Sequence, residues 1–277
     1  MTDTATVHQT VRPTVRPAAS SVQQWWVLTV RTIIPTLRNG ELLTQAFASI
    51  IFTVGFYIPL KKIMSPFIEG MSSYAQYLTP LIMLQAVAFA AVSAAFRAAT
   101  DSVRGINRRF ESMPIAPLIP LAARMSASMY RCLIALAVSL ICGHVIGFRF
   151  YSGVAHTVGF CVLAVLIGAA LSLLGDLIGA ANKSPEATMP IMLVPQLVFG
   201  LLSVGLQPVE RFPEWIHPFV RNQPASQFVY ALRALAGDST PAAGEVTWSV
   251  IGPALAWIVG MMVIVIPLHA RVSARRR

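Results

Sequence analysis

Charged residues are scarce in this sequence, and acidic residues are the scarcest. Asp, Glu, Lys and Arg make up 12% of the 277 residues, whereas soluble domains carry about 25%. Apolar residues make up 56%. The chain therefore lacks the polar surface of a soluble enzyme, and its composition indicates a protein that resides in lipid.

Motifs for catalysis and metal binding are also missing. The sequence has no HExxH, GxSxG or CxxC, and its three cysteines are scattered through apolar stretches. Gly179–Ser184 (GAANKS) comes nearest to a Walker A loop, but Asn182 stands where a second glycine must bring backbone amides to the phosphates. We expect no enzyme activity, no metal and no cofactor in this chain.

What the sequence does contain is six long runs without a charge. They cover 42–60, 70–96, 132–148, 150–175, 187–209 and 246–270. A helix of about 20 apolar residues crosses the hydrocarbon core, and these runs lack the alternation of barrel strands. The prediction is an all-α membrane protein with six transmembrane helices. They form one domain, 21–277, after a disordered cytoplasmic tail at 1–20.

Basic residues are distributed unequally between the two sides of these spans. With the N-terminus inside, fourteen Lys and Arg residues fall on the cytoplasmic side and six on the outer side. Cytoplasmic loops are enriched in Lys and Arg, so both termini are expected in the cytoplasm and the protein in the plasma membrane. The net charge of +10 then reflects topology and contact with anionic lipid, and no nucleic-acid partner is expected.

The segment 23–38 (QQWWVLTVRTIIPTLR) precedes the first span. Trp26, Val30, Ile33 and Leu37 recur at helical spacing, and the two arginines fall on another face. This pattern predicts an amphipathic helix that lies in the inner interface and ends at the turn Asn39-Gly40. A cytoplasmic extension of the first span is the alternative.

A second amphipathic segment, 100–113 (TDSVRGINRRFESM), joins the second and third spans. Its apolar residues form one stripe, Thr100 or Asp101 is expected to cap its start, and Pro114 stops it. The candidate contact residues are Val103, Arg104, Gly105, Ile106, Arg108, Arg109, Phe110, Glu111 and Met113. Periodicity fits either a helix lying on lipid or a helix inserted into a groove on a cytoplasmic partner.

Asp176 is the one acid inside a predicted span. A charged group at the bilayer centre costs about 2.5–3.5 kcal/mol on insertion scales, so a partner is expected. Arg124 and Arg131, on the adjacent third span at similar depth, are the candidates for a structural ion pair. The alternative is a carboxylate that serves a proton or a substrate.

The long outer region, 207–247, has helical character of its own. Residues 222–236 show one apolar face, with Asn222 as a cap, Pro224 in the first turn and Gly237 at the end. We expect a re-entrant hairpin of two short helices, with a helix lying flat on the outer surface as the alternative. Its candidate residues are Trp215, Pro218, Asn222, Pro224, Phe228 and Arg233.

The segment 101–125 (DSVRGINRRFESMPIAPLIPLAARM) resembles the cytoplasmic loop of ABC-2-type permeases, in particular the daunorubicin-resistance group with its mycobacterial B-type permeases. The shared features are Gly105, Arg109-Phe110, Ser112-Met113-Pro114 and Arg124, together with an outer element from Asn222-Gln223-Pro224 to Leu232-Arg233. Two features depart from the broader pattern. Ser102, Val103 and Arg104 replace the acidic residues that often precede the glycine, and Gln223 separates Asn from Pro.

The resemblance implies a permease subunit of an ATP-driven exporter. Segment 100–113 would be a coupling helix seated on a separate ABC-type ATP-binding subunit, which would hold ATP-Mg. A second permease, related (C-type) rather than identical, would complete the transport path. The cargo would be a large hydrophobic compound, either an anthracycline drug or an envelope lipid such as phthiocerol dimycocerosate. The competing functions are a proton-coupled multidrug carrier and a non-transporting membrane scaffold.

Overall fold

The computed structural model describes residues 20–67, 71–106, 116, 118–182, 184–240 and 244–274. The described residues form helices and turns, and no strand occurs among them. The α-helices are α1 (Ser21–Arg38), α2 (Glu41–Met64), α3 (Tyr74–Val103), α5 (Ile119–Ile146), α6 (Gly153–Ala181), α7 (Pro185–Leu201), α8 (His217–Asn222), α9 (Pro224–Ala236) and α10 (Trp248–Ala274). Three short 3-10 helices lie at Ser65–Phe67, Val209–Arg211 and Glu214–Ile216.

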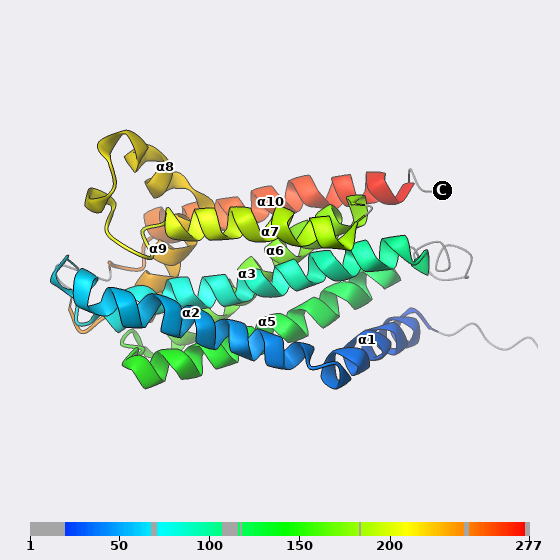
Figure 1. Ribbon diagram of the computed structural model, residues 1–277, viewed down its shortest axis with the longest axis horizontal. Helices are drawn as coiled ribbons and strands as arrows, with labels where there is room; N and C mark the ends of the chain where they lie inside the picture. Colours follow the sequence, from blue (N-terminus) through cyan, green and yellow to red (C-terminus); the bar gives the residue numbers. More distant parts are fainter. Residues whose placement is uncertain are drawn as a thin grey trace, which may run out of the picture.

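Long helices run side by side along the longest axis of the molecule (Figure 1). In the described part of the chain, α2, α3, α5, α6 and α10 are long and apolar enough to cross a membrane. The sixth predicted span corresponds to α7, which has 17 residues and is therefore about 25 Å long. The all-helical membrane architecture is thus confirmed, whereas the count of six spans stays a prediction.

The two ends of the bundle differ. At one end, here called the terminal end, lie α1, the start of α5 and the last turns of α3, α6 and α10 (Figure 1). The opposite, hairpin end carries α8, α9 and the turn from α5 to α6. Helix α3 begins at the hairpin end and ends at the terminal end (Figure 1).

Helix α3 is the centre of the bundle. Its most apolar 18-residue stretch is 83% buried, and it packs against α2, α5, α6, α7 and α9. The contact with α6 is the closest, because small residues face each other there. A Cβ added at Gly175 would lie 2.6 Å from the carbonyl oxygen of Ala91, and one at Gly179 would lie 2.0 Å from that of Ala95. Small residues allow helices in lipid to approach until their backbones touch.

The predicted amphipathic helix is present as α1, and it ends at Asn39-Gly40 as expected. Its start was not predicted in detail: Ser20 and Gln23 form a capping box. The side of α1 that packs into the bundle carries two threonines. Thr29 and Thr36 are buried, whereas the apolar side chains of Trp26, Val27, Ile34 and Leu37 are exposed. The exposed apolar face is therefore available to lipid.

Helix α5 begins at Ile119, ahead of the uncharged run at 132–148, and includes both Arg124 and Arg131. Two local predictions were wrong. Residues 100–103 are the last turn of α3, and Thr100 donates to the carbonyl of Phe96 inside that helix instead of capping a new one. Asn222 ends α8 and donates to the carbonyl of Pro218, so the residue at the start of α9 is Gln223. Gly237 does end α9, with φ of 71°.

The α3–α6 contact gives a test of packing. Gly179→Ala should lower stability by about 1–3 kcal/mol, the usual cost of overpacking, because the new methyl group collides with backbone at Ala95. Thermal unfolding of the purified chain in detergent measures the loss. Gly260→Ala is the matched control, since nothing lies within 4 Å of the added Cβ. Equal melting temperatures for the two variants would contradict the close contact.

Candidate functional site

Charged side chains gather inside the terminal end of the bundle, in two clusters. The first is centred on Asp176 of α6, which is 3% exposed. Arg124 of α5 donates through Nε to Asp176 Oδ1 at 2.8 Å and through Nη2 to Oδ2 at 3.3 Å. His269 of α10 lies with Nε2 2.7 Å from Oδ2 of the same carboxylate. One buried carboxylate thereby joins three helices.

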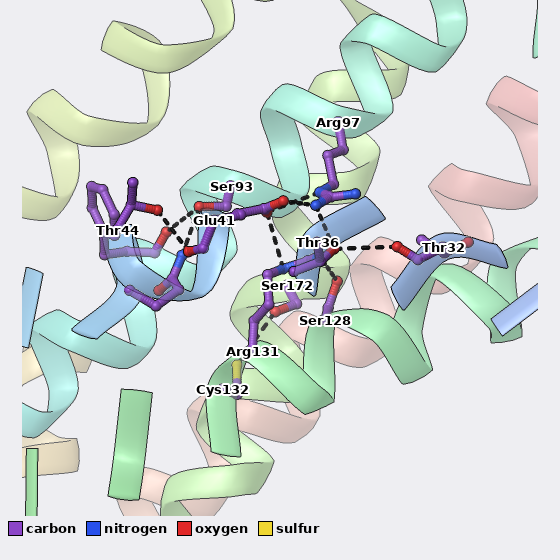
Figure 2. A network of polar contacts seen from close by, with 12 residues as sticks. Thr32, Thr36, Glu41, Thr44, Ser93, Arg97, Ser128, Arg131, Cys132 and Ser172 are labelled. Atoms are coloured by element: carbon purple, nitrogen blue, oxygen red, sulfur yellow. Dashed lines mark hydrogen bonds and ion pairs between the residues drawn. The ribbon is translucent and has the colours of Figure 1, made fainter. Parts of the chain in front are cut away.

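The second cluster is centred on Glu41, at the start of α2 (Figure 2). Arg97 of α3 forms an ion pair with this carboxylate and also donates through Nη2 to Thr36 Oγ1 of α1 at 2.6 Å. Arg131 of α5 approaches it with Nε 3.7 Å from Glu41 Oε1. The cluster therefore ties α1, α2, α3 and α5 together at one point.

Arg131 is the most deeply buried of these cations, at 2% exposed. Its Nη2 donates to Ser128 at 2.9 Å, but Nε and Nη1 have no hydrogen-bond partner among the residues that the structure describes. Two guanidinium groups thus share the single carboxylate of Glu41. A cation with incomplete hydrogen bonding in an apolar interior is costly, which makes Glu41 important for the stability of this end.

Of the two arginines considered from the sequence, Arg124 contacts Asp176 and Arg131 does not. Sequence reasoning missed Glu41, Arg97 and His269. Each stands at the edge of an uncharged run, where a charged residue is ordinarily taken to face the headgroups. In the structure these edges lie inside helices: α2 begins at Glu41, α3 continues past Arg97 to Val103, and α10 continues past His269 to Ala274.

The segment considered for coupling begins at the exposed end of α3. Val103 and Arg104 are exposed, and the backbone turns at Gly105, with φ of 67°. Ile106 is partly buried. Arg108, Arg109, Phe110, Glu111 and Met113 lie outside the described residues. The segment connects α3, which ends beside Arg97, to α5, which begins before Arg124, so it lies between the two charged clusters in the sequence.

At the hairpin end, α9 is embedded in the bundle rather than lying on its exterior. Phe228 and Arg233 are among its nine buried residues, and it packs against α3, α6 and α10. Trp215 is exposed before α8, and Pro218 lies in the first turn of that helix. Pro224 is the first residue of α9.

Arg233 had been counted as an outer basic residue, yet it is 7% exposed. Its Nη2 donates to the carbonyls of Tyr77 at 3.0 Å and Val204 at 3.2 Å, and its guanidinium lies 3.8 Å from the centroid of the Tyr77 ring. Such a cation–π contact strengthens when the cation is desolvated. Arg233 therefore fastens α9 to α3 and to the turn after α7.

An apolar cavity of about 220 Å³ lies between α3, α6, α7, α9 and α10. Its wall is formed by aliphatic, methionine and phenylalanine side chains, with Gln85 and Gln196 as the two residues of polar character. It exists because α7 packs on α3 but makes sparse contacts with α6 and sparser ones with α10.

Comparison with known proteins agrees with this architecture. Residues 30–270 match the family described as ABC-2 family transporter protein. The chain belongs to the ABC-2 transporter family. Since the match covers α2 through most of α10, this protein is a multi-pass membrane permease subunit of an ABC transporter.

Named relatives point to the same group of permeases. The chain is 51% identical over 262 residues, 93% of its length and 91% of the relative's, to the doxorubicin resistance ABC transporter permease protein DrrB of Mycobacterium tuberculosis. It is 27% identical to the probable doxorubicin resistance permease DrrC of the same organism, over 67% of this chain and 62% of the relative. The daunorubicin resistance permease DrrB1 of Streptomyces coeruleorubidus is also 27% identical, over 61% and 60%. The predicted family is confirmed, and these relatives are named as permeases, not as ATPases.

The Asp176 cluster gives the second test. Asp176→Asn leaves Arg124 and His269 buried beside a neutral amide, and removing one partner of a buried pair costs about 3–5 kcal/mol. A large drop in melting temperature in detergent is therefore expected. Glu245→Gln, which alters an exposed acid, is the control and should melt like the unchanged chain.

A charge swap separates a structural role from a transport role. The double variant Arg124→Asp/Asp176→Arg restores one ion pair between α5 and α6, so it should regain part of the stability lost by Asp176→Asn. The regain is expected to be partial because His269 then faces a guanidinium. A swap variant no more stable than Asp176→Asn would argue against the structural pair.

Proposed function

We propose that this permease forms the membrane path of an ATP-driven exporter for large hydrophobic compounds. The observation that carries the proposal is the match to the ABC-2 family over residues 30–270. In this proposal a separate ABC-type subunit binds ATP-Mg, and a second permease, related rather than identical, pairs with this one. The similarity to both DrrB and DrrC of one organism supports a heterodimer.

The proposed topology places the terminal end in the cytoplasm. Six spans result when α7 is counted with the five longer helices, α1 lies in the inner interface with its apolar face toward lipid, and α8–α9 re-enter the outer leaflet as a hairpin. The excess of Lys and Arg at the terminal end supports this orientation. The exposed Trp26 on α1 supports the interfacial position.

Coupling to ATP is proposed to pass through the segment between α3 and α5. A displacement of this segment moves the ends of both helices, and the charged clusters carry the motion onward. Arg124 would transmit the motion to α6 and α10 through Asp176. Arg97 would transmit it to α1 and α2 through Thr36 and Glu41. Buried ion pairs suit this role because breaking them is costly, so the connected helices move as one body.

The proposed cargo is an anthracycline such as doxorubicin or daunorubicin, as the names of the relatives suggest. The apolar wall of the cavity beside α7 supports a hydrophobic cargo. An envelope lipid such as phthiocerol dimycocerosate is the second candidate of the same chemical character.

The pair formed by Asp176 and His269 favours one competing function, a carrier driven by protons, because both groups are titratable. The purified complex in liposomes distinguishes the two. ATP-dependent transport that continues when the proton gradient is collapsed supports the exporter, and transport that follows the gradient without ATP supports the carrier.

The coupling assignment is tested with the complete transporter. Phe110→Asp should abolish cargo-stimulated ATPase activity, because a carboxylate replaces the apolar anchor of the segment, while membrane insertion remains normal. Phe110→Leu keeps the anchor apolar and is the matched control, with most of the stimulation retained. Unchanged stimulation in Phe110→Asp would exclude this segment as the coupling element.

The orientation is tested with a single exposed cysteine. Arg104→Cys in intact cells should resist a membrane-impermeant maleimide and should react with it in inverted vesicles. Trp215→Cys, exposed near the hairpin end, should show the opposite pattern. The reverse pattern for the two positions would invert the proposed topology.

A further inference from the structure

The cavity beside α7 has a feature that a mere packing defect would lack. Gln196 of α7 donates through Nε2 to both the backbone oxygen and Oε1 of Gln85 on α3, each at 3.0 Å. Among the residues that the structure describes, Gln196 Oε1 has no hydrogen-bond partner. The side-chain nitrogen of Gln85 donates no hydrogen bond within that part of the chain either.

The side-chain nitrogen of Gln85 is therefore an unused donor at an otherwise apolar wall, whereas Gln196 Oε1 is enclosed by protein atoms. A buried polar group without a partner is costly, so few remain in native proteins. The glycine at position 200 of α7 leaves room for the amide of Gln85. A Cβ at this position would lie 1.6 Å from Gln85 Nε2.

The cavity also has a lateral opening beside α7. Ile191 and Phe199 of α7 line it and are exposed, and α7 has few contacts with α6 and α10 on this side. In a membrane this opening faces hydrocarbon, so an apolar molecule reaches the cavity from the bilayer without crossing water. Helix α7 runs along α3 (Figure 1).

The size of the cavity indicates what fits. Sites that enclose a whole small molecule occupy about 300–1,000 Å³, and this cavity is about 220 Å³. It is suited to one compact part of a molecule, with the remainder extending through the lateral opening. The methionines Met192 and Met261 in its wall adapt to ligands of different shape.

We propose that this cavity binds an apolar molecule through a hydroxyl group, whose oxygen accepts a hydrogen bond from Gln85 Nε2. A hydroxyl oxygen is an acceptor, so it satisfies the Gln85 donor in one contact. The proposal rests on the export function proposed above and deepens it, since it names a cargo class and an entry site within a single permease. Lipid chains, which carry no such group, are poorer occupants.

Pyrene and 1-hydroxypyrene are suitable probes because they differ only in one hydroxyl. Native mass spectrometry of the purified full chain, released from detergent micelles, measures the affinity of each. The unchanged chain should bind 1-hydroxypyrene about fivefold more tightly than pyrene, the gain given by one net hydrogen bond. Equal binding of the two probes would overturn the proposal and identify a slot for lipid chains.

Three variants locate the site. Gln85→Met removes the donor and should remove the difference between the probes while pyrene still binds. Ala88→Leu fills the cavity from α3 and should weaken both probes at least tenfold. Ala46→Leu, at a partly buried position of α2 outside the cavity, is the control for an added leucine and should leave both unchanged. Unchanged binding in Ala88→Leu would overturn the site.

A variant at the rim of the cavity provides an independent test in case the other variants misfold. Ile191→Trp narrows the opening without touching the amide pair and should also weaken both probes; full binding would overturn the entry route. These measurements need neither ATP nor the ATP-binding subunit. Their failure would therefore leave the coupling test with Phe110→Asp intact, and a failure of that test would leave the binding result intact.

Discussion

A charged side chain inside a bilayer must be satisfied by other protein groups, and in this permease that constraint decides which helices move together. Asp176 forms ion pairs with Arg124 and His269, and Glu41 forms ion pairs with Arg97 and Arg131. Hydrocarbon supplies no alternative hydrogen bonds to these groups. Each cluster therefore holds its helices more firmly than apolar packing in lipid, which lacks the driving force that water provides.

The two clusters occupy the end of the bundle at which the proposed ATP-binding subunit would dock. They involve α5 after the proposed coupling segment and α3 before it, and they reach α1, α2, α6 and α10. The opposite end is held differently, by Arg233 and Gln223. Gln223 donates to the carbonyls of Phe199 and Leu202 at the end of α7. These bonds hold the hairpin on the bundle without a buried carboxylate, because the acceptors are backbone oxygens.

Two neighbours of α3, the helices α6 and α7, differ in how closely they pack. Gly175 and Gly179 of α6 lie against backbone at Ala91 and Ala95, so α3 and α6 interlock with no space to slide apart. Helix α7 meets α3 through an amide pair, has prolines at 190 and 195, and leaves a cavity against α6 and α10. Helix α7 packs on α3 but not closely on α6 or α10, whereas the α3–α6 core provides the fixed frame.

Much of this arrangement could be predicted from residue patterns, and the errors share a cause. The helices followed from uncharged runs, α1 from its periodicity, and the Arg124–Asp176 contact from the cost of an isolated buried acid. Glu41, Arg97 and His269 were missed because each lies at the edge of an uncharged run, and a one-dimensional pattern assigns such edges to the headgroups. The same reasoning cut α3 short at 96, although that helix continues past Arg97 to Val103. Arg233 was misjudged because it lies in the outer segment between two runs, where an exposed position is expected.

The sequence alone determined that this protein is a helical membrane permease of the ABC-2 family, because the length and apolarity of its runs admit few other structures and its loop carries the family's pattern. Only the tertiary structure decided which charge meets which, how closely α3 and α6 approach, and where a cavity remains. Those properties depend on side chains far apart in the chain, such as Arg97 and Glu41 or Gln85 and Gln196, and no local pattern encodes their distance.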